Sequence, residues 1–227
     1  MARWYSDYLE RWIADRLNND ENPYVSDAME FDLANMSKRD IYLWMTRLIN
    51  PRPIAWVSTL SKNGDANLAP FSFFNGVGSS PPTLVFCPAN KRDGTPKDTL
   101  VNIQQTGQFV VNVVTMELAE MMHATAEELE SDIDEFEFAA IKKQKSQNVS
   151  VPRVAKALAA FECEMFQVIS LATGPGAANL VIGRILSMYV SDQLINKTSG
   201  QFESENLPTI GRMGDQNYTR TSDRFKI

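Results

Sequence analysis

Histidine and cysteine are scarce in this chain of 227 residues, which has one histidine and two cysteines. The single histidine, His123, excludes a histidine-rich metal site, and no Gly-x-Ser-x-Gly elbow accompanies it as a hydrolase of that type would require. Cys87 and Cys163 lie far apart in apolar segments, so they form neither a disulfide framework nor a Cys-x-x-Cys motif. We predict two buried thiols and no metal site, with His123 late in a helix as a packed or surface residue.

Positive charge and long apolar runs are also lacking. Lysine and arginine number 22 against 28 aspartates and glutamates, a formal net charge of -6, which argues against a nucleic-acid partner. The sequence has no apolar run of about 18 residues that could span a membrane, and charges interrupt its first residues, unlike a secretory signal. We therefore expect a cytoplasmic protein that binds neither nucleic acid nor a membrane.

The hydrophobic content of 44% is enough for one large core. Aromatic and aliphatic residues recur at helical spacing between Trp4 and Leu17, which predicts an amphipathic helix, and residues 18–36 are polar and acidic. We predict an N-terminal helical arm and connector over residues 1–37 and one domain over residues 38–227.

Strand signals dominate that domain. Runs rich in β-branched and aromatic residues, separated by Gly and Pro clusters, predict strands. The first three are expected to form an antiparallel meander with a turn at Asn63-Gly64, and the last two a hairpin in which Gly174–Asn179 is the turn. The predicted strands cover residues 53–60, 66–75, 83–87, 109–114, 158–172 and 179–190.

Helices are predicted between and before the strands, over residues 38–48, 97–106 and 116–129. The acidic run of Asp132, Asp134, Glu135 and Glu137 is interpreted as a solvated face. Glu162 and Glu164 are interpreted as the outward positions of a half-exposed strand. Because the turns are too short for regular crossovers, this pattern favours a mainly β fold, a closed or nearly closed barrel with peripheral helices.

Two stretches combine polar residues in a way that an ordinary strand pair does not need. In the first, from Arg52 to Asn75, Pro70 marks a sheet edge or a bulge, and Ser72 can face a ligand. In the second, Lys97 is expected to precede a helix cap formed by Asp98 or Thr99, where free N–H groups bind anions. Together they offer the amides, hydroxyls and cation that a flavin phosphate requires.

These residues and their order resemble the flavin reductase-like, FMN-binding split-barrel family. The resemblance runs from about residue 42 to residue 218, and it rests on short motifs in matching order and spacing. They are Arg52-Pro-Ile-Ala-Trp-Val-Ser-Thr59, Asn67-Leu-Ala-Pro-Phe-Ser-Phe-Phe-Asn75, Ser80-Pro-Pro-Thr-Leu84, Lys97-Asp-Thr99, Asn102, Phe109-Val-Val-Asn112, Asp134-Glu-Phe136, Val151-Pro-Arg153, Glu162-Cys163, Gly183 and Ile210-Gly-Arg212.

The resemblance implies a Greek-key-like split β-barrel, a homodimer, and an NAD(P)H:FMN oxidoreductase with NADH or NADPH as electron donor. No residue is implied as a catalytic acid or base, because the protein would orient a hydride transfer between cofactors. Lys97, Ser72 and Thr99 are implied to hold the phosphate. The implied cofactor contacts are Arg52, Pro53, Ile54, Trp56, Ser58, Ala69, Pro70, Ser72, Phe73, Asn75, Lys97, Asp98, Thr99, Asn102 and Arg212.

Departures from the family pattern leave alternatives open. Trp56 stands where the family pattern has a smaller aliphatic residue, so we expect it to alter access to the flavin. Arg212 is expected to help position the second substrate. The protein could instead hold FMN tightly and pass electrons to a partner without nicotinamide turnover. It could also be a split-barrel module that binds no flavin.

Overall fold

The computed structural model describes residues 30–130 and 133–227, so the helix predicted between Trp4 and Leu17 lies outside the described residues. Contacts divide the chain into two compact units between Tyr42 and Leu43. The predicted helix before the first strand is confirmed as α2 (Lys38–Leu48), which follows the 3-10 turn η1 (Leu33–Asn35). Ser37 precedes α2, and its hydroxyl accepts the Asp40 N–H at 3.1 Å, a helix cap.

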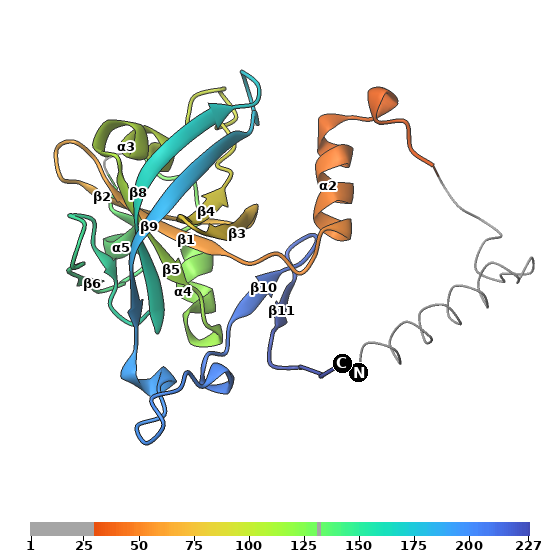
Figure 1. Ribbon diagram of the computed structural model, residues 1–227. Coiled ribbons are helices and arrows are strands. Elements are labelled where there is room, and N and C mark those ends of the chain that lie inside the picture. Colours follow the sequence, from red (N-terminus) through yellow and green to blue (C-terminus); the bar gives the residue numbers. More distant parts are fainter. Residues whose placement is uncertain (1–29, 131–132) are drawn as a thin grey trace, which may run out of the picture. The chain divides into compact units, whose positions relative to one another are not determined.

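A seven-stranded antiparallel sheet forms the body of the second unit (Figure 1). The order across the sheet is β2-β1-β5-β8-β9-β4-β3. The predicted hairpin of the last two long strands and its Gly174–Asn179 turn are confirmed. The strands are β1 (Ala55–Leu60), β2 (Ala66–Phe71), β3 (Phe74–Ser79), β4 (Pro82–Phe86), β5 (Gln108–Val113), β8 (Ala159–Ser170) and β9 (Asn179–Val190).

Short elements surround this sheet, in agreement with the predicted mainly β fold with peripheral helices. The helices are α3 (Asp98–Thr106), η2 (Met116–Leu118), α4 (Ala119–Ala124), α5 (Glu135–Phe138), η3 (Asp192–Leu194) and η4 (Ser204–Asn206). Two small ribbons complete the fold, β6 (Lys143–Gln144) with β7 (Arg153–Val154), and β10 (Ile210–Arg212) with β11 (Tyr218–Arg220).

The sheet is curled because its two edge strands are joined directly. β2 and β3 are the first and last strands in the order, yet Ser72 and Phe73 alone separate them along the chain. Two linking residues bridge at most about 10 Å, so the ends of the two edges must meet. The prediction of one strand over residues 66–75 in a meander is therefore wrong, since the chain passes there from one edge of the barrel to the other.

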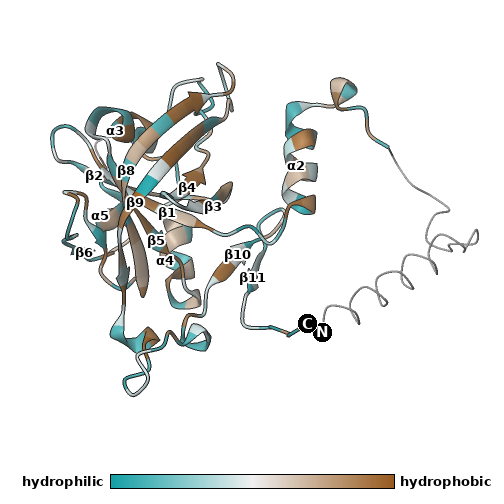
Figure 2. Ribbon diagram, viewed as in Figure 1, coloured by the Kyte–Doolittle hydropathy of each residue, from teal (hydrophilic) through white to brown (hydrophobic). Residues whose placement is uncertain are grey.

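Strand β1, next to edge strand β2, has buried apolar residues on both of its faces, and Figure 2 shows the apolar character of the strands around it. Ala55 and Val57 belong to the barrel interior, together with residues of β4, β5, β8 and β9 and with Leu100 of α3. Trp56 faces the other way and packs in a second cluster with Met122 of α4 and Phe136 of α5. The alternation of a strand thus builds two cores, one inside the barrel and one under the short helices.

Three predictions about exposure and helix length are corrected. The helix expected over residues 116–129 is the 3-10 turn η2 followed by α4, which ends at Ala124. Glu162 is not an outward residue but 3% exposed. Burial works against its ionisation, yet the N–H groups of Gln147 and Asn148 donate to it at 2.8 and 2.6 Å and leave its pKa lowered. Cys163 is buried as predicted, whereas Cys87 is half-buried.

Gly183 of β9 allows the closest packing inside the barrel. The Phe109 ring, fully buried, covers its backbone so tightly that a Cβ at position 183 would lie 2.3 Å from Cζ of that ring. We expect Gly183→Ala to lower the free energy of unfolding by about 1–3 kcal/mol through overpacking. Urea denaturation of Gly183→Ala and of Gly76→Ala, a strand position with nothing within 4 Å, provides the measurement and its control. Equal stability of the two variants would contradict this packing.

Candidate functional site

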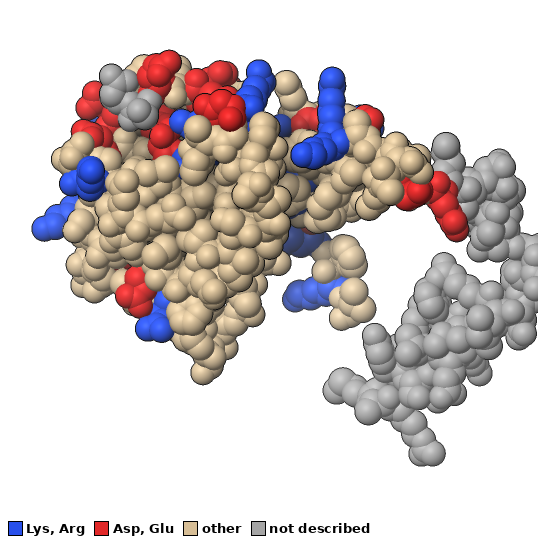
Figure 3. All heavy atoms as spheres, turned by 90° about the horizontal axis from the view of Figure 1, so that it is seen from above, with Lys and Arg blue, Asp and Glu red and all other residues tan. Residues whose placement is uncertain are grey.

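Charged side chains are spread unevenly over the face seen in Figure 3, where acidic groups gather at one edge and a broad area carries few charges. Exposed acids of the segment after α4 include Glu127, Glu128 and Glu130. Acidic side chains repel an anionic ligand. An anion can therefore bind in this region only where a basic side chain offsets their charge.

Arg52 fastens the junction between the two edge strands. Its side chain is 4% exposed, and its Nε donates to Ser72 Oγ at 3.3 Å. Its two terminal nitrogens donate to the carbonyls of Ile49 at 2.9 Å and Met213 at 3.0 Å. The guanidinium therefore ties the junction to the end of α2 and to the loop after β10. Because a hydroxyl that accepts one hydrogen bond can still donate another, Ser72 keeps a donor for a ligand.

The first group of predicted site residues comes together around Arg52. Arg52 and Arg212 pair through their backbones at 2.9 and 2.8 Å, and the Arg212 guanidinium lies 4.5 Å from the Tyr218 ring centre. Arg52, Pro53 and Ile54 line an apolar cavity of about 220 Å³. That volume is below the roughly 300 Å³ at which ligand pockets begin, so this cavity is too small for a whole flavin.

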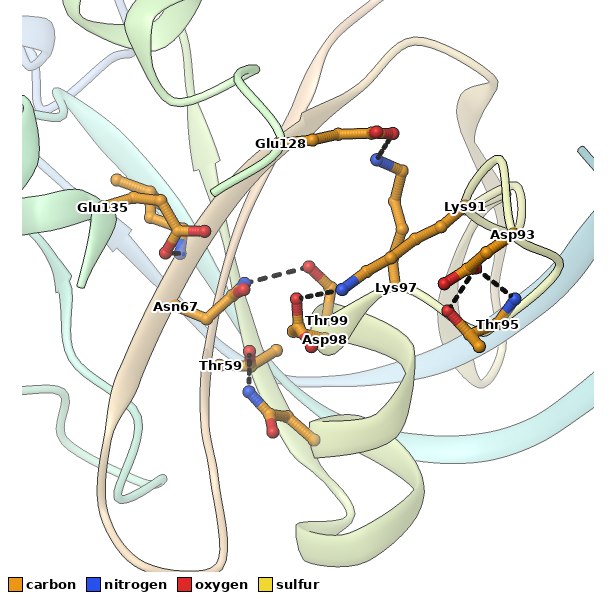
Figure 4. A network of polar contacts seen from close by, with 12 residues as sticks. Thr59, Asn67, Lys91, Asp93, Thr95, Lys97, Asp98, Thr99, Glu128 and Glu135 are labelled. Carbon is orange, nitrogen blue, oxygen red and sulfur yellow. Dashed lines mark hydrogen bonds and ion pairs between the residues drawn. The ribbon is translucent and has the colours of Figure 1, made fainter. Parts of the chain in front are cut away.

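Buried amide and hydroxyl pairs attach helix α3 to the sheet (Figure 4). Asn67 Nδ2 of β2 donates to Thr99 Oγ1 at 2.9 Å, and Asn102 Nδ2 of α3 donates to Thr59 Oγ1 of β1 at 3.1 Å. Thr99 is 1% and Asn102 is 6% exposed. Both side chains thus hold the helix in place. Next to them, a polar cavity of about 410 Å³ lies beside the β1–β2 turn and includes Asp98 and Asn102.

The beginning of α3 presents a lysine instead of the predicted Asp or Thr cap. Lys97 is itself the cap residue and makes no side-chain cap bond, while Asp98 pairs with Lys91 at 2.9 Å. Lys97 Nζ lies 3.5 Å from Glu128 Oε1, with 29% of the lysine side chain exposed. A cation beside a helix N-terminus favours an anion there, since the helix dipole and the ammonium act in the same direction.

Trp56 and Ser58 lie in the core, with side chains that are fully buried. Trp56 Nε1 donates to Thr125 Oγ1 at 2.9 Å, and Ser58 Oγ donates to the Pro152 carbonyl at 2.6 Å. Trp56 thus attaches β1 to the end of α4, and Ser58 attaches β1 to the chain directly before β7. Trp56 thereby contacts Thr125, from which the segment after α4 starts, and it pairs with Pro70 across the β1–β2 ladder.

The remaining predicted residues form a partly accessible strip of consecutive chain along the junction, in which Ala69 packs against the barrel interior and Pro70 lies on the opposite face of β2. Ala69, Pro70, Ser72 and Phe73 are half-buried, and Asn75 is exposed. Pro70 lies on edge strand β2, as its missing N–H predicts. The strip offers backbone polar groups, a hydroxyl, an amide and an aromatic ring, which are the groups that a flavin ring and its side chain require.

Glu135 is a residue of this region that the sequence interpretation missed. It is 9% exposed, and its carboxylate accepts the Leu68 N–H of edge strand β2 at 3.0 Å. Burial raises the pKa of this carboxyl, although the bond from Leu68 works in the opposite direction. The interpretation of the acidic run as solvated is wrong here. The signal was the Asp134-Glu-Phe136 motif, in which Asp134 caps α5 by accepting the Phe136 N–H at 2.8 Å.

Residues 45–204 match the family described as flavin reductase like domain. This chain belongs to that family. An uncharacterized protein of Aquifex aeolicus is 35% identical over 88% of this chain and 99% of its own length. The expected family is therefore confirmed, and with it a domain of a kind that typically binds FMN.

Solved structures give the same result for the fold. Nitrilotriacetate monooxygenase component B from Bacillus cereus is 32% identical over 89% of this chain and all of its own, with a TM-score of 0.83. The 2-nitrobenzoate 2-nitroreductase NbaA from Pseudomonas fluorescens is also 32% identical, over 88% of this chain and 95% of its own, with a TM-score of 0.79. A structure with a split barrel domain from Shewanella frigidimarina covers 88% of this chain and 98% of its own, has a TM-score of 0.74 at 22% identity, and supports the split-barrel fold.

Two features are absent from the part of the chain that the structure describes. Within residues 30–130 and 133–227, no three His, Cys, Asp or Glu side chains are grouped as a metal ion would require. In the same part of the chain, no helix has the length and apolar character needed to cross a membrane.

The Glu135 carboxylate gives a test of how edge strand β2 is held. Glu135→Ala leaves the buried Leu68 N–H without its acceptor, and we expect the free energy of unfolding to fall by about 1–3 kcal/mol. Glu135→Gln keeps a carbonyl oxygen for that bond and should lose less. Thermal and urea denaturation of both variants would measure this order, and a larger loss in Glu135→Gln would contradict it.

Proposed function

We propose that this protein is an FMN-binding oxidoreductase that acts as an NAD(P)H-dependent flavin reductase. The observation that carries the proposal is the geometry at the start of α3. Lys97, a half-buried lysine, lies at the N-terminus of this helix. Hydrogen bonds of Asn67 and Asn102 attach the helix to β2 and β1, and β2 leads into the strip from Ala69 to Asn75. A phosphate group and an aromatic ring system would thus find their partners on neighbouring elements.

Each residue would contribute by binding and orientation. Lys97 and the first N–H groups of α3 would bind the phosphate, and the Ser72 hydroxyl would donate a further hydrogen bond. The β2–β3 junction would orient the ring, because Arg52 holds Ser72 in place. Bound FMN would supply the hydride acceptor for a reduced nicotinamide. The protein would act by orienting both partners, so the step requires no side chain as acid or base.

The two 32% identical relatives differ in what their names describe. One is a component of a monooxygenase and the other is a nitroreductase. The family therefore supports flavin-dependent reduction more firmly than one terminal acceptor. An electron-transfer protein that holds FMN without nicotinamide turnover is the alternative, and a spectrum separates the two.

The absorbance spectrum with FMN tests the proposal. We expect the wild type to bind FMN and the flavin bands to bleach anaerobically on addition of NADH or NADPH. Lys97→Gln should weaken FMN binding at least about ten-fold, the effect of losing a charge-assisted bond to phosphate worth about 1.5–3 kcal/mol. Lys145→Gln, at an exposed position directly after β6, is the matched control.

The outcomes distinguish the functions. If FMN binds but its absorbance bands persist with both NADH and NADPH, the protein is an electron carrier that another protein reduces. FMN that keeps its free fluorescence and spectrum in the presence of the wild type would overturn the flavoprotein assignment.

We also propose a homodimer. Strands β8 and β9 carry large apolar side chains at the surface of the protomer, with Phe166 60% and Met188 62% exposed, and Leu171, directly after β8, is 65% exposed. Figure 2 shows apolar stretches along both strands. Exposed apolar patches of this kind mark interaction surfaces, and a second copy of the same strands would cover them.

Light scattering after gel filtration measures the assembly. We expect a mass about twice the 25.5 kDa of one chain, and Met188→Lys should shift the protein toward the monomer because it places a charge in the apolar patch. Lys62→Glu, a charge change in the β1–β2 turn, should leave the mass unchanged. A monomeric wild type at micromolar concentration would contradict the dimer.

A further inference from the structure

The lysine at the start of α3 already has an anionic partner within the protein. Lys97 Nζ and Glu128 Oε1 are 3.5 Å apart, with 29% and 51% of the two side chains exposed. Figure 4 shows the two side chains reaching toward one another across the space beside Asn67 and Thr99. Glu128 belongs to the segment after α4. None of the family motifs contains a residue of that segment.

The root of that segment is fixed to the barrel. Thr125, at the end of α4, is 1% exposed, and its hydroxyl accepts the Trp56 indole N–H at 2.9 Å while donating to the Met122 carbonyl at 2.9 Å. Glu128 follows only three residues later. A buried hydrogen bond to β1 thus fixes the start of the segment that brings Glu128 near Lys97.

A phosphate bound at the start of α3 would meet both members of this pair. It needs the Lys97 ammonium as its counter-charge, and it is repelled by a carboxylate within a few ångströms. The Lys97 ammonium has three N–H donors, but a phosphate that takes one of them comes close to the Glu128 carboxylate. The repulsion between the two anions opposes phosphate binding as long as Glu128 keeps its contact with Lys97, whereas a flavin without a phosphate meets no such repulsion. The cost of breaking the pair falls on the phosphorylated ligand alone.

From this geometry we propose that Glu128 is a specificity-determining residue. Its carboxylate competes with the flavin phosphate for Lys97, and so sets how strongly the site prefers FMN over riboflavin. This inference rests on the proposed FMN function and deepens it.

The test compares the dissociation constants of FMN and riboflavin, measured by quenching of flavin fluorescence. Glu128→Gln keeps the size of the side chain and removes its charge, and we expect FMN to bind about two- to five-fold more tightly, the range that the energies of exposed ion pairs imply. Riboflavin binding should stay the same. Glu127→Gln removes the same charge from the exposed neighbouring residue and should change neither constant.

A second comparison separates the ion pair from a general change in charge. In a Lys97→Gln background, Glu128→Gln should lose most of its effect on FMN, because the lysine for which it competes is gone. Equal gains from Glu127→Gln and Glu128→Gln, or an undiminished gain without Lys97, would overturn the inference while leaving FMN binding intact. A wild type that binds no FMN would instead overturn the proposed function, and this inference with it.

Discussion

The passage from β2 to β3 through Ser72 and Phe73 constrains the rest of the structure. It brings the two edges of a seven-stranded sheet to one place, so the sheet closes on itself and its interior fills with side chains from β1, β4, β5, β8 and β9. Near the junction, Glu135 accepts the Leu68 N–H of edge strand β2, and Arg52 donates to the Ser72 hydroxyl between the two edges. The ligand groups proposed for flavin binding lie at this same seam, because there the barrel offers accessible polar atoms.

Helix α3 connects the interior of the barrel with the proposed phosphate site. Leu100 enters the barrel core, while Asn102 and Thr99 form buried hydrogen bonds to β1 and β2. Buried amide and hydroxyl pairs are costly to break, since each partner would be left unsatisfied. The helix start, and Lys97 with it, is therefore held firmly relative to the strip along the junction. Rigid placement of this kind is what orients a cofactor.

Trp56, which stands where the family pattern has a smaller aliphatic residue, makes contacts outside its own motif. Its ring fills the cluster under α4 and α5, and its N–H reaches the root of the segment that carries Glu128. The expectation that it alters access to a flavin remains a prediction, and the structure gives it a route. Trp56 is also the cross-strand partner of Pro70, so it touches both β2 beside the strip and the residue from which the Glu128 segment starts.

Local patterns determined much of this protein. Runs of β-branched and aromatic residues predicted β1 and β5, and alternation of polar and apolar residues predicted β8, because both signals are properties of neighbours in sequence. The motif from Arg52 to Asn75 indicated the family and most of the candidate site. Tertiary structure alone decided that residues 66–75 divide between two edges, that Glu135 and Glu162 are buried acceptors, and that Lys97 meets Glu128. Those contacts join segments far apart in sequence, and their partners depend on how the sheet closes rather than on any local preference.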